Sequence, residues 1–170
     1  MIIYFVVFFG IASMCTVLQT NIPLFFSIAG LFPIPDLAFI VLVYISFIQG
    51  EMMGQVLGFT SGVVMDCLSL SPFGFNAFVH TVMGHIVGRF KGVILLDTVF
   101  LPIAVVAIAF FAKTIVCIGM AFLLGQAFII QRIVSLDFLL QFVFTILLSP
   151  FVFYSLKGLS SILLMRKAYH

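Results

Sequence analysis

Gly50-Glu-Met-Met-Gly54-Gln-Val-Leu-Gly58-Phe-Thr-Ser-Gly62-Val-Val-Met-Asp66 is the most informative stretch of this 170-residue sequence. Glycine recurs every four residues, and the next step of four falls on Asp66. Because residues four apart lie nearly above one another on an α-helix, the stretch predicts a groove of bare backbone ending in a carboxylate. In water each glycine would cost a helix about 1 kcal/mol relative to alanine. In a bilayer the groove lets a second helix pack backbone to backbone, so the pattern indicates an inner helix of a membrane bundle.

Composition places the whole chain in a membrane. The sequence is 65% hydrophobic and 7% charged, with a mean hydropathy of +1.43. A soluble domain carries about 25% charged residues, so this chain has too few to cover a water-facing surface. We therefore expect a single integral membrane domain over residues 1–170, in contact with lipid, whose N-terminal apolar run is a retained helix because it lacks a basic region before it.

Apolar runs and the breaks between them predict six transmembrane helices, an all-α bundle. They lie at about 2–18, 36–49, 51–68, 74–89, 97–124 and 137–157, followed by a short C-terminal tail. Pro35-Asp36 suits the first turn of a helix, and Ser135-Leu-Asp137 is typical of an N-cap. Residues 24–34 are apolar but contain Gly30 and Pro33, so they form either a re-entrant loop or part of the second helix.

Basic residues indicate the orientation. With six spans, one side would hold Arg89, Lys91, Arg166, Lys167 and Lys157, and the other Arg132 alone. Since cytoplasmic loops carry the excess of Lys and Arg, we expect both termini in the cytoplasm.

The helix predicted at 74–89 repeats the step of four with Asn76, His80, Gly84 and Gly88. Gly54 and Asp66 are twelve positions apart, as are Asn76 and Gly88, and each separation is about 18 Å of helix. We expect these two helices to pack antiparallel, with Asp66 hydrogen-bonded to Asn76, His80 or both. A path for a solute along the groove is the less favoured interpretation. The predicted packing residues are Gly50, Gly54, Gly58, Gly62, Gly84 and Gly88.

Five polar residues are expected at membrane depth: Asp36, Asp66, Asn76, His80 and Lys113. A charge in hydrocarbon costs at least about 2.5 kcal/mol, so Asp36, Asp66 and Lys113 each need a partner or a role. The two acids either share a proton or cation or, as we favour, Asp36 caps its helix and Asp66 pairs within the bundle. Lys113 has a long stem, and we expect it to pair with Asp66, with Asp36 as the second choice.

No catalytic, cofactor or metal site is predicted. The chain has no G-x-S-x-G, no H-E-x-x-H and no phosphate-binding glycine loop, so we do not expect an enzyme. His80 and His85 are five residues apart and fall on different helix faces, which suits no shared metal. Three scattered cysteines suggest neither a disulfide framework nor a metal cluster. A formal net charge of +2 gives no reason to expect a nucleic-acid partner.

Several of these features together resemble the MreD family, the rod shape-determining membrane proteins of bacteria. They are Pro35-Asp36, the glycine run that ends at Asp66, and Ser71-Pro72-x-Gly74 leading into a helix with Gly84, His85 and Gly88. The likeness covers nearly the whole chain, with its motif core between about 35 and 92.

The resemblance implies properties that the residues alone do not. It implies an architecture similar to the substrate-binding (S) component of energy-coupling-factor vitamin transporters, in the bacterial cytoplasmic membrane. It implies association with MreC, within elongation machinery that also contains MreB, RodA and a class B penicillin-binding protein. The implied role is to help direct lateral peptidoglycan synthesis, without known catalysis.

Two functions remain open at this point. One is a scaffold that docks a partner such as MreC, with the outer loop 22–34 and the apolar lipid faces as candidate surfaces. The alternative is a solute-binding transporter component of the same fold. Its cavity would need several polar groups, and the outer helix ends supply chiefly Asp36, Asp66, Asn76, His80 and Gln141.

Overall fold

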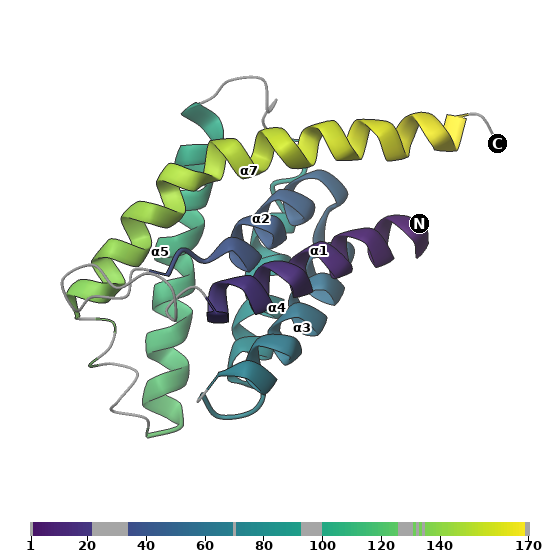
Figure 1. The fold of residues 1–170 in the computed structure, drawn as a ribbon. Coiled ribbons are helices and arrows are strands. Elements are labelled where there is room, and N and C mark those ends of the chain that lie inside the picture. Colours follow the sequence, from purple (N-terminus) through teal and green to yellow (C-terminus); the bar gives the residue numbers. More distant parts are fainter. Residues whose placement is uncertain are drawn as a thin grey trace.

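The computed structural model describes residues 2–21, 34–69, 71–92, 100–125, 131, 133 and 135–168, and this part of the chain is all-helical. Six helices follow one another in Figure 1, as predicted: α1 (Ile2–Asn21), α2 (Leu37–Gln49), α3 (Glu51–Leu68), α4 (Phe75–Gly88), α5 (Phe100–Leu123) and α7 (Leu136–Ala168). The largest difference is at α7, which was expected to end near 157 and instead continues to Ala168. The region 24–34, whose structure the sequence left open, lies outside the described residues except for Ile34.

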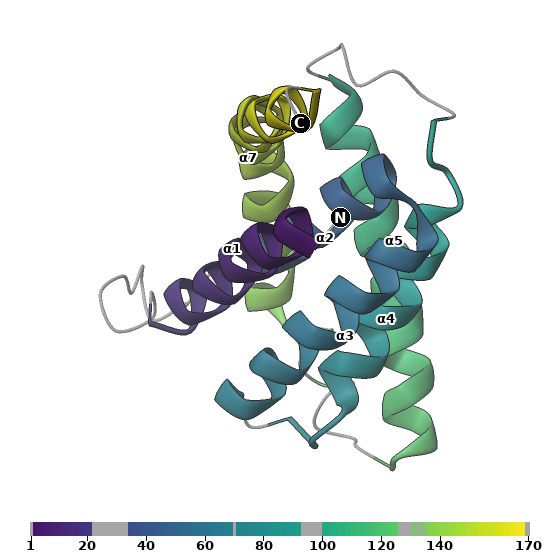
Figure 2. The same cartoon turned by 90° about the vertical axis from the view of Figure 1, so that its right-hand side faces the viewer.

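The helices α3 and α4 form the closest pair, side by side and antiparallel (Figures 1 and 2). A Cβ added at Gly54 would lie 2.5 Å from the carbonyl oxygen of Gly84, and one at Gly88 would lie 2.5 Å from the Cα of Glu51. Gly58 and Gly62 approach the α4 backbone at least as closely. Such separations are shorter than a real side chain tolerates, so the two backbones touch only because these positions are glycine.

Gly50 lies just before α3 and not inside it, but it still meets α4, because a Cβ added at Gly88 would lie 2.7 Å from the carbonyl carbon of Gly50. Gly50 has a φ of +94 and is both the C-cap of α2 and the N-cap of α3. Gly74 has a similar φ of +93 at the start of α4. Both positions need the left-handed backbone that glycine adopts at little cost, which makes the two turns around α3 tight.

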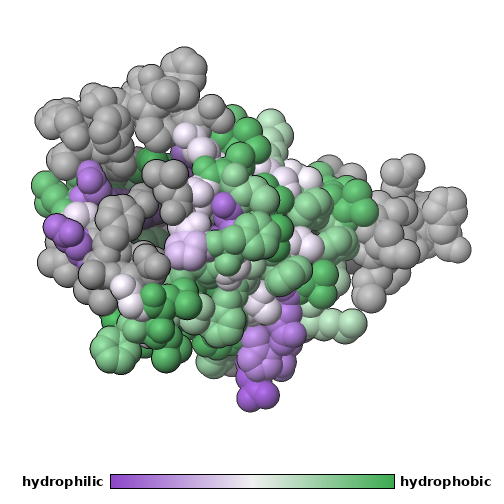
Figure 3. Space-filling model, turned by 90° about the horizontal axis from the view of Figure 1, so that it is seen from below, coloured by the Kyte–Doolittle hydropathy of each residue, from purple (hydrophilic) through white to green (hydrophobic). Residues whose placement is uncertain are grey.

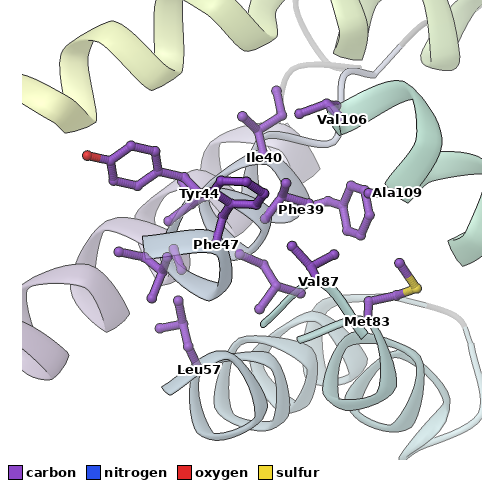
Figure 4. Close-up of a cluster of buried hydrophobic side chains, with 14 of the residues drawn as sticks. Phe39, Ile40, Tyr44, Phe47, Leu57, Met83, Val87, Val106 and Ala109 are labelled. Atoms are coloured by element: carbon purple, nitrogen blue, oxygen red, sulfur yellow. The ribbon is translucent and has the colours of Figure 1, made fainter. Parts of the chain in front are cut away.

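The core is built around α2, which contacts α1, α3, α4, α5 and α7. Ten consecutive residues of this helix, from Ala38 to Phe47, are buried. Figure 4 shows Phe39, Tyr44 and Phe47 of α2 among side chains of the neighbouring helices. Burial on all sides explains why α2 is apolar around its whole circumference.

The long helices α5 and α7 lie at the outside of the bundle. They are the two described helices long and apolar enough to cross a membrane, over Phe100–Leu123 and Leu136–Ser160; shorter apolar helices cover Phe5–Thr20 and Leu37–Gln49. Most residues of α5 and of the Leu136–Ser160 part of α7 are not buried. Large apolar side chains cover much of the molecular surface that Figure 3 shows. This distribution suits a protein surrounded by lipid tails.

Pro150 lies inside α7, and the helix changes direction along its course (Figure 1). A proline has no N–H, so the carbonyl of Ile146, four residues earlier, loses its helical donor. The hydroxyl of Ser149 donates to that carbonyl at 2.7 Å. A side chain thus replaces the missing main-chain donor, as an apolar surrounding requires.

The backbone contact predicts that Gly84→Ala lowers the free energy of unfolding by about 1–3 kcal/mol, the usual cost of overpacking. The new methyl group would press on the Gly54 carbonyl. Gly119→Ala on α5 is the control, because its Cβ would meet nothing within 4 Å; alanine there should be neutral or stabilising by up to about 1 kcal/mol. Thermal unfolding in detergent, followed by circular dichroism, measures both, and equal losses would contradict the contact.

Candidate functional site

Asp66, at the end of α3, binds the start of α4. Its carboxylate accepts hydrogen bonds from the main-chain N–H groups of Gly74 (2.9 Å), Asn76 (2.9 Å) and Ala77 (3.1 Å). The side chains of Asn76 (2.9 Å) and Ser71 (3.4 Å) also donate to it. Gly74 is the N-cap of α4 and has no side chain to cap with, so Asp66 supplies the capping carboxylate from the preceding helix.

Asn76 is therefore one of the two partners expected for Asp66, whereas His80 is not the other. His80 is fully buried, and neither ring nitrogen has a hydrogen-bond partner in the described structure. Its ring lies 6.2 Å from that of Phe39, on the side of α4 that faces α2. Asp66 is already saturated by groups close to it in sequence, which leaves no role for a histidine one turn further along α4.

Asp36 is the N-cap of α2 and is 1% exposed. Its carboxylate accepts from the N–H of Phe39 at 3.1 Å, and its own N–H donates to the hydroxyl of Thr145 at 3.0 Å. Lys113 of α5 donates to the second carboxylate oxygen and forms an ion pair with it. One residue therefore holds together α2, α5 and α7.

The expected pairing of Lys113 with Asp66 is wrong, and the second choice, Asp36, is the partner. The reason is the order of the helices. Lys113 lies on α5, which packs on α2, α4 and α7, whereas Asp66 lies on α3, which packs on α1, α2 and α4. The ammonium also lies 4.6 Å from the centre of the Phe39 ring, an attractive cation–π arrangement.

Sequence reasoning missed the neutral polar groups around this pair. Thr145 accepts from Asp36, and the side-chain carbonyl of Gln19 accepts from the N–H of Ala38 at 3.4 Å. These groups occupy N–H donors of the α2 start, where no intrahelical acceptor exists. The sequence did contain a signal for these groups: Gln19 and Thr145 are polar residues inside apolar helices, and such residues rarely face lipid.

A second cluster, also missed, lies at the opposite end of α3 and α4. Glu51 contacts His85 at 3.2 Å and Arg89 at 3.6 Å, and Gln55 contacts the same His85 nitrogen at 2.6 Å. The Lys91 ammonium donates to the carbonyl of Gln49 at 2.9 Å. His85 and Arg89 are four residues apart and so share a helix face, which could have revealed the cluster. The side chains are exposed, so each pair contributes at most about 1 kcal/mol.

A cavity of about 390 Å³ opens at the end of the bundle that holds Asp36. Helix ends gather here: α1 and α3 finish at this end, and α2, α4 and α7 begin. Asp36, Lys113, Asn76 and Gln141 line it with other polar and apolar residues. The described residues that line it are Gln19, Thr20, Ile34, Asp36, Met65, Leu68, Ser69, Ser71, Pro72, Phe75, Asn76, Phe110, Lys113, Thr114, Cys117, Ile133, Phe138 and Gln141. Neither Asp66 nor His80 lines the cavity, although both were expected among its polar groups.

The chemistry of the cavity suits binding. No three His, Cys, Asp or Glu side chains of the described residues lie close enough together to hold a metal ion. Asp36, the one acid among the described lining residues, is neutralised by Lys113 beside it and bound by the main-chain N–H of Phe39. Such an arrangement positions helices and offers polar contacts to an occupant.

Removing one member of the buried pair should be far worse than removing both. Lys113→Met leaves the Asp36 carboxylate buried without its counter-ion, which costs about 3–5 kcal/mol. The double variant Asp36→Asn/Lys113→Met keeps a capping oxygen and removes both charges, so it should recover most of that loss. Unfolding of the four proteins in a double-mutant cycle measures the coupling, and strictly additive effects would refute it.

Asp66→Ala should destabilise the α3–α4 pair by more than about 3 kcal/mol, since each hydrogen bond to a charged group contributes about 1.5–3 kcal/mol. Asp66→Asn keeps one acceptor oxygen and should lose less. Hydrogen exchange of the Asn76 and Ala77 amides reports the change directly. Unchanged protection in Asp66→Ala would show that another group caps α4.

Comparison with known protein families matches residues 1–158 to MreD, described as rod shape-determining protein MreD. Comparisons with curated proteins and with solved structures give no match, so the likeness to transporter S components stays a prediction. The family match covers nearly the whole chain and includes the packing glycines of α3 and α4, Asp36, Asp66 and the described residues that line the cavity. The chain therefore belongs to the MreD family, whose members are non-catalytic membrane proteins of the complex that determines rod shape.

Proposed function

We propose that this protein is a membrane scaffold of the bacterial elongation complex, and that it binds MreC at the cavity end of the bundle. Membership of the MreD family supports a role in rod shape determination. The observation that carries the docking proposal is the cavity of about 390 Å³, large enough to take several side chains of a partner. A buried ion pair fixes the helices that surround it.

The cavity end faces the outside of the cytoplasmic membrane in this proposal, and both termini face the cytoplasm. Arg89 and Lys91 lie at the opposite end of α4, beyond Gly88. The start of α1 and the end of α7, which carries Arg166 and Lys167, belong to that end by helix order. The positive-inside rule then supports an outward-facing cavity, accessible to the membrane-proximal part of an extracytoplasmic partner.

In this proposal the protein acts by holding its partner in place. By holding MreC, the protein would help direct lateral peptidoglycan synthesis by the elongation machinery, which also contains MreB, RodA and a class B penicillin-binding protein. An occupant of the cavity would touch α1, α3, α4, α5 and α7 together with the start of α2.

The alternative is a solute-binding component of an energy-coupling-factor-type transporter, with the S-component architecture. The same cavity favours it, because its volume also suits a small molecule. The two proposals differ in what remains bound after purification: a stoichiometric protein partner supports the scaffold, and a retained small molecule supports the transporter component.

Filling the cavity should release MreC. Met65 lines the cavity near the end of α3, and Met65→Trp should reduce co-purification of MreC from detergent by at least about tenfold if docking depends on this space. Met52→Trp is the matched control, since Met52 lies at the other end of α3 and is 73% exposed. Both variants should fold as the parent does in size-exclusion chromatography. Equal retention of MreC by the two variants would place its binding elsewhere.

A further inference from the structure

The charges of the cavity restrict what can occupy it. Among the described residues that line it, Asp36 is the one acid and Lys113 the one base. They are paired with each other, and the Asp36 side chain is 1% exposed whereas that of Lys113 is 12% exposed. An occupant therefore meets the ammonium and hardly touches the carboxylate.

The ammonium retains hydrogen-bonding capacity. A lysine has three N–H donors, and one is directed at Asp36. Several hydroxyl groups on the wall already donate within the protein: Thr114 to the carbonyl of Phe110 at 2.9 Å, Thr20 to that of Thr16 at 2.8 Å, and Ser71 to Asp66. Lys113 is thus the cationic donor that the wall offers to an acceptor on an occupant.

The ion pair as a whole carries no net charge, so the cavity disfavours a charged occupant. A carboxylate brought to Lys113 would lie beside Asp36 and repel it, and a second cation would lie beside Lys113. Like charges in such a partly dry site are disfavoured. The remaining wall is largely apolar, with Met65, Leu68, Phe75, Phe110 and Phe138. The best occupant is uncharged, apolar in its side chains and equipped with one strong acceptor.

We propose that the cavity takes an uncharged, apolar peptide segment and that Lys113 anchors it through a main-chain carbonyl. Inside an α-helix the carbonyls already accept helical hydrogen bonds, so the anchored residue lies in a turn, an extended stretch or the last turn of a helix. This inference rests on the proposed function and states which kind of MreC segment would fit: a neutral, apolar, non-helical segment that reaches the cavity end of the bundle. Lys113 is then a specificity-determining residue as well as a structural one.

The experiment uses a photo-crosslinking residue, p-benzoylphenylalanine, in place of Phe138 on the cavity wall, with the full chain co-expressed with MreC. The MreC residue captured is then changed to Gln, Glu and Lys. Gln should be captured as well as the original residue, and Glu and Lys at least about tenfold less, because a misplaced charge costs more than a lost neutral contact.

Two variants of the chain separate anchoring from folding. In Asp36→Asn, Lys113 has no counter-ion, so the Glu form of MreC should be captured better than the Gln form, a reversal that a purely structural role of Lys113 would not produce. Asp36→Asn/Lys113→Met lacks the ammonium and should capture every form at a level at least about tenfold below the parent, since a hydrogen bond to a charged group is lost.

Each other outcome has a definite meaning. Stronger capture of Glu than of Gln by the parent, or full capture by the double variant, would overturn the inference. The inference would also be overturned if position 138 captured only lipid or a small molecule while MreC still co-purified. In that case the proposed function would survive, because MreC would bind elsewhere on the protein. If MreC does not co-purify at all, the proposed function fails first.

Discussion

Backbone contact between α3 and α4 is the constraint on which the rest of the structure depends. Gly54, Gly58 and Gly62 meet α4 where any side chain would collide with main-chain atoms. In lipid, apolar side chains gain little from leaving the solvent, so close packing must hold helices together. The contact fixes the register of the pair, and with that register Asp66 meets the first N–H groups of α4.

The two buried acids, Asp36 and Asp66, bind the starts of helices. Asp66 and Asp36 each sit where a helix begins, where main-chain N–H groups lack intrahelical partners. Asp66 is held by donors within eleven residues of it, so it needs no cation. Asp36 has fewer donors close to it in sequence, and it forms an ion pair with Lys113 on α5, a helix far from it in the sequence. That difference leaves the ammonium beside the cavity and gives this end of the bundle its one accessible cation among the described lining residues.

The two ends of the bundle differ in how they are built. At one end, exposed side chains such as Glu51 and Arg89 form weak ion pairs around a tight glycine turn. At the other, buried polar groups bind helix starts and leave a cavity between them. Of the two ends, only the one with buried polar groups has a cavity described, and this is the end at which the proposed function places the partner.

Local sequence determined that the chain is a membrane protein and where the six helices of the described chain lie, because apolar runs and Pro-Asp starts act over a few residues. It also determined the glycines at steps of four by which α3 and α4 pack. It also made Asn76 a partner of Asp66, since a short turn joins their helices. Only the tertiary structure decided that Lys113 meets Asp36 and that Thr145 reaches the start of α2. It also decided that neither ring nitrogen of His80 has a hydrogen-bond partner among the described residues. These depend on which helices are neighbours around α2, and spacing along a single helix carries no information about that arrangement.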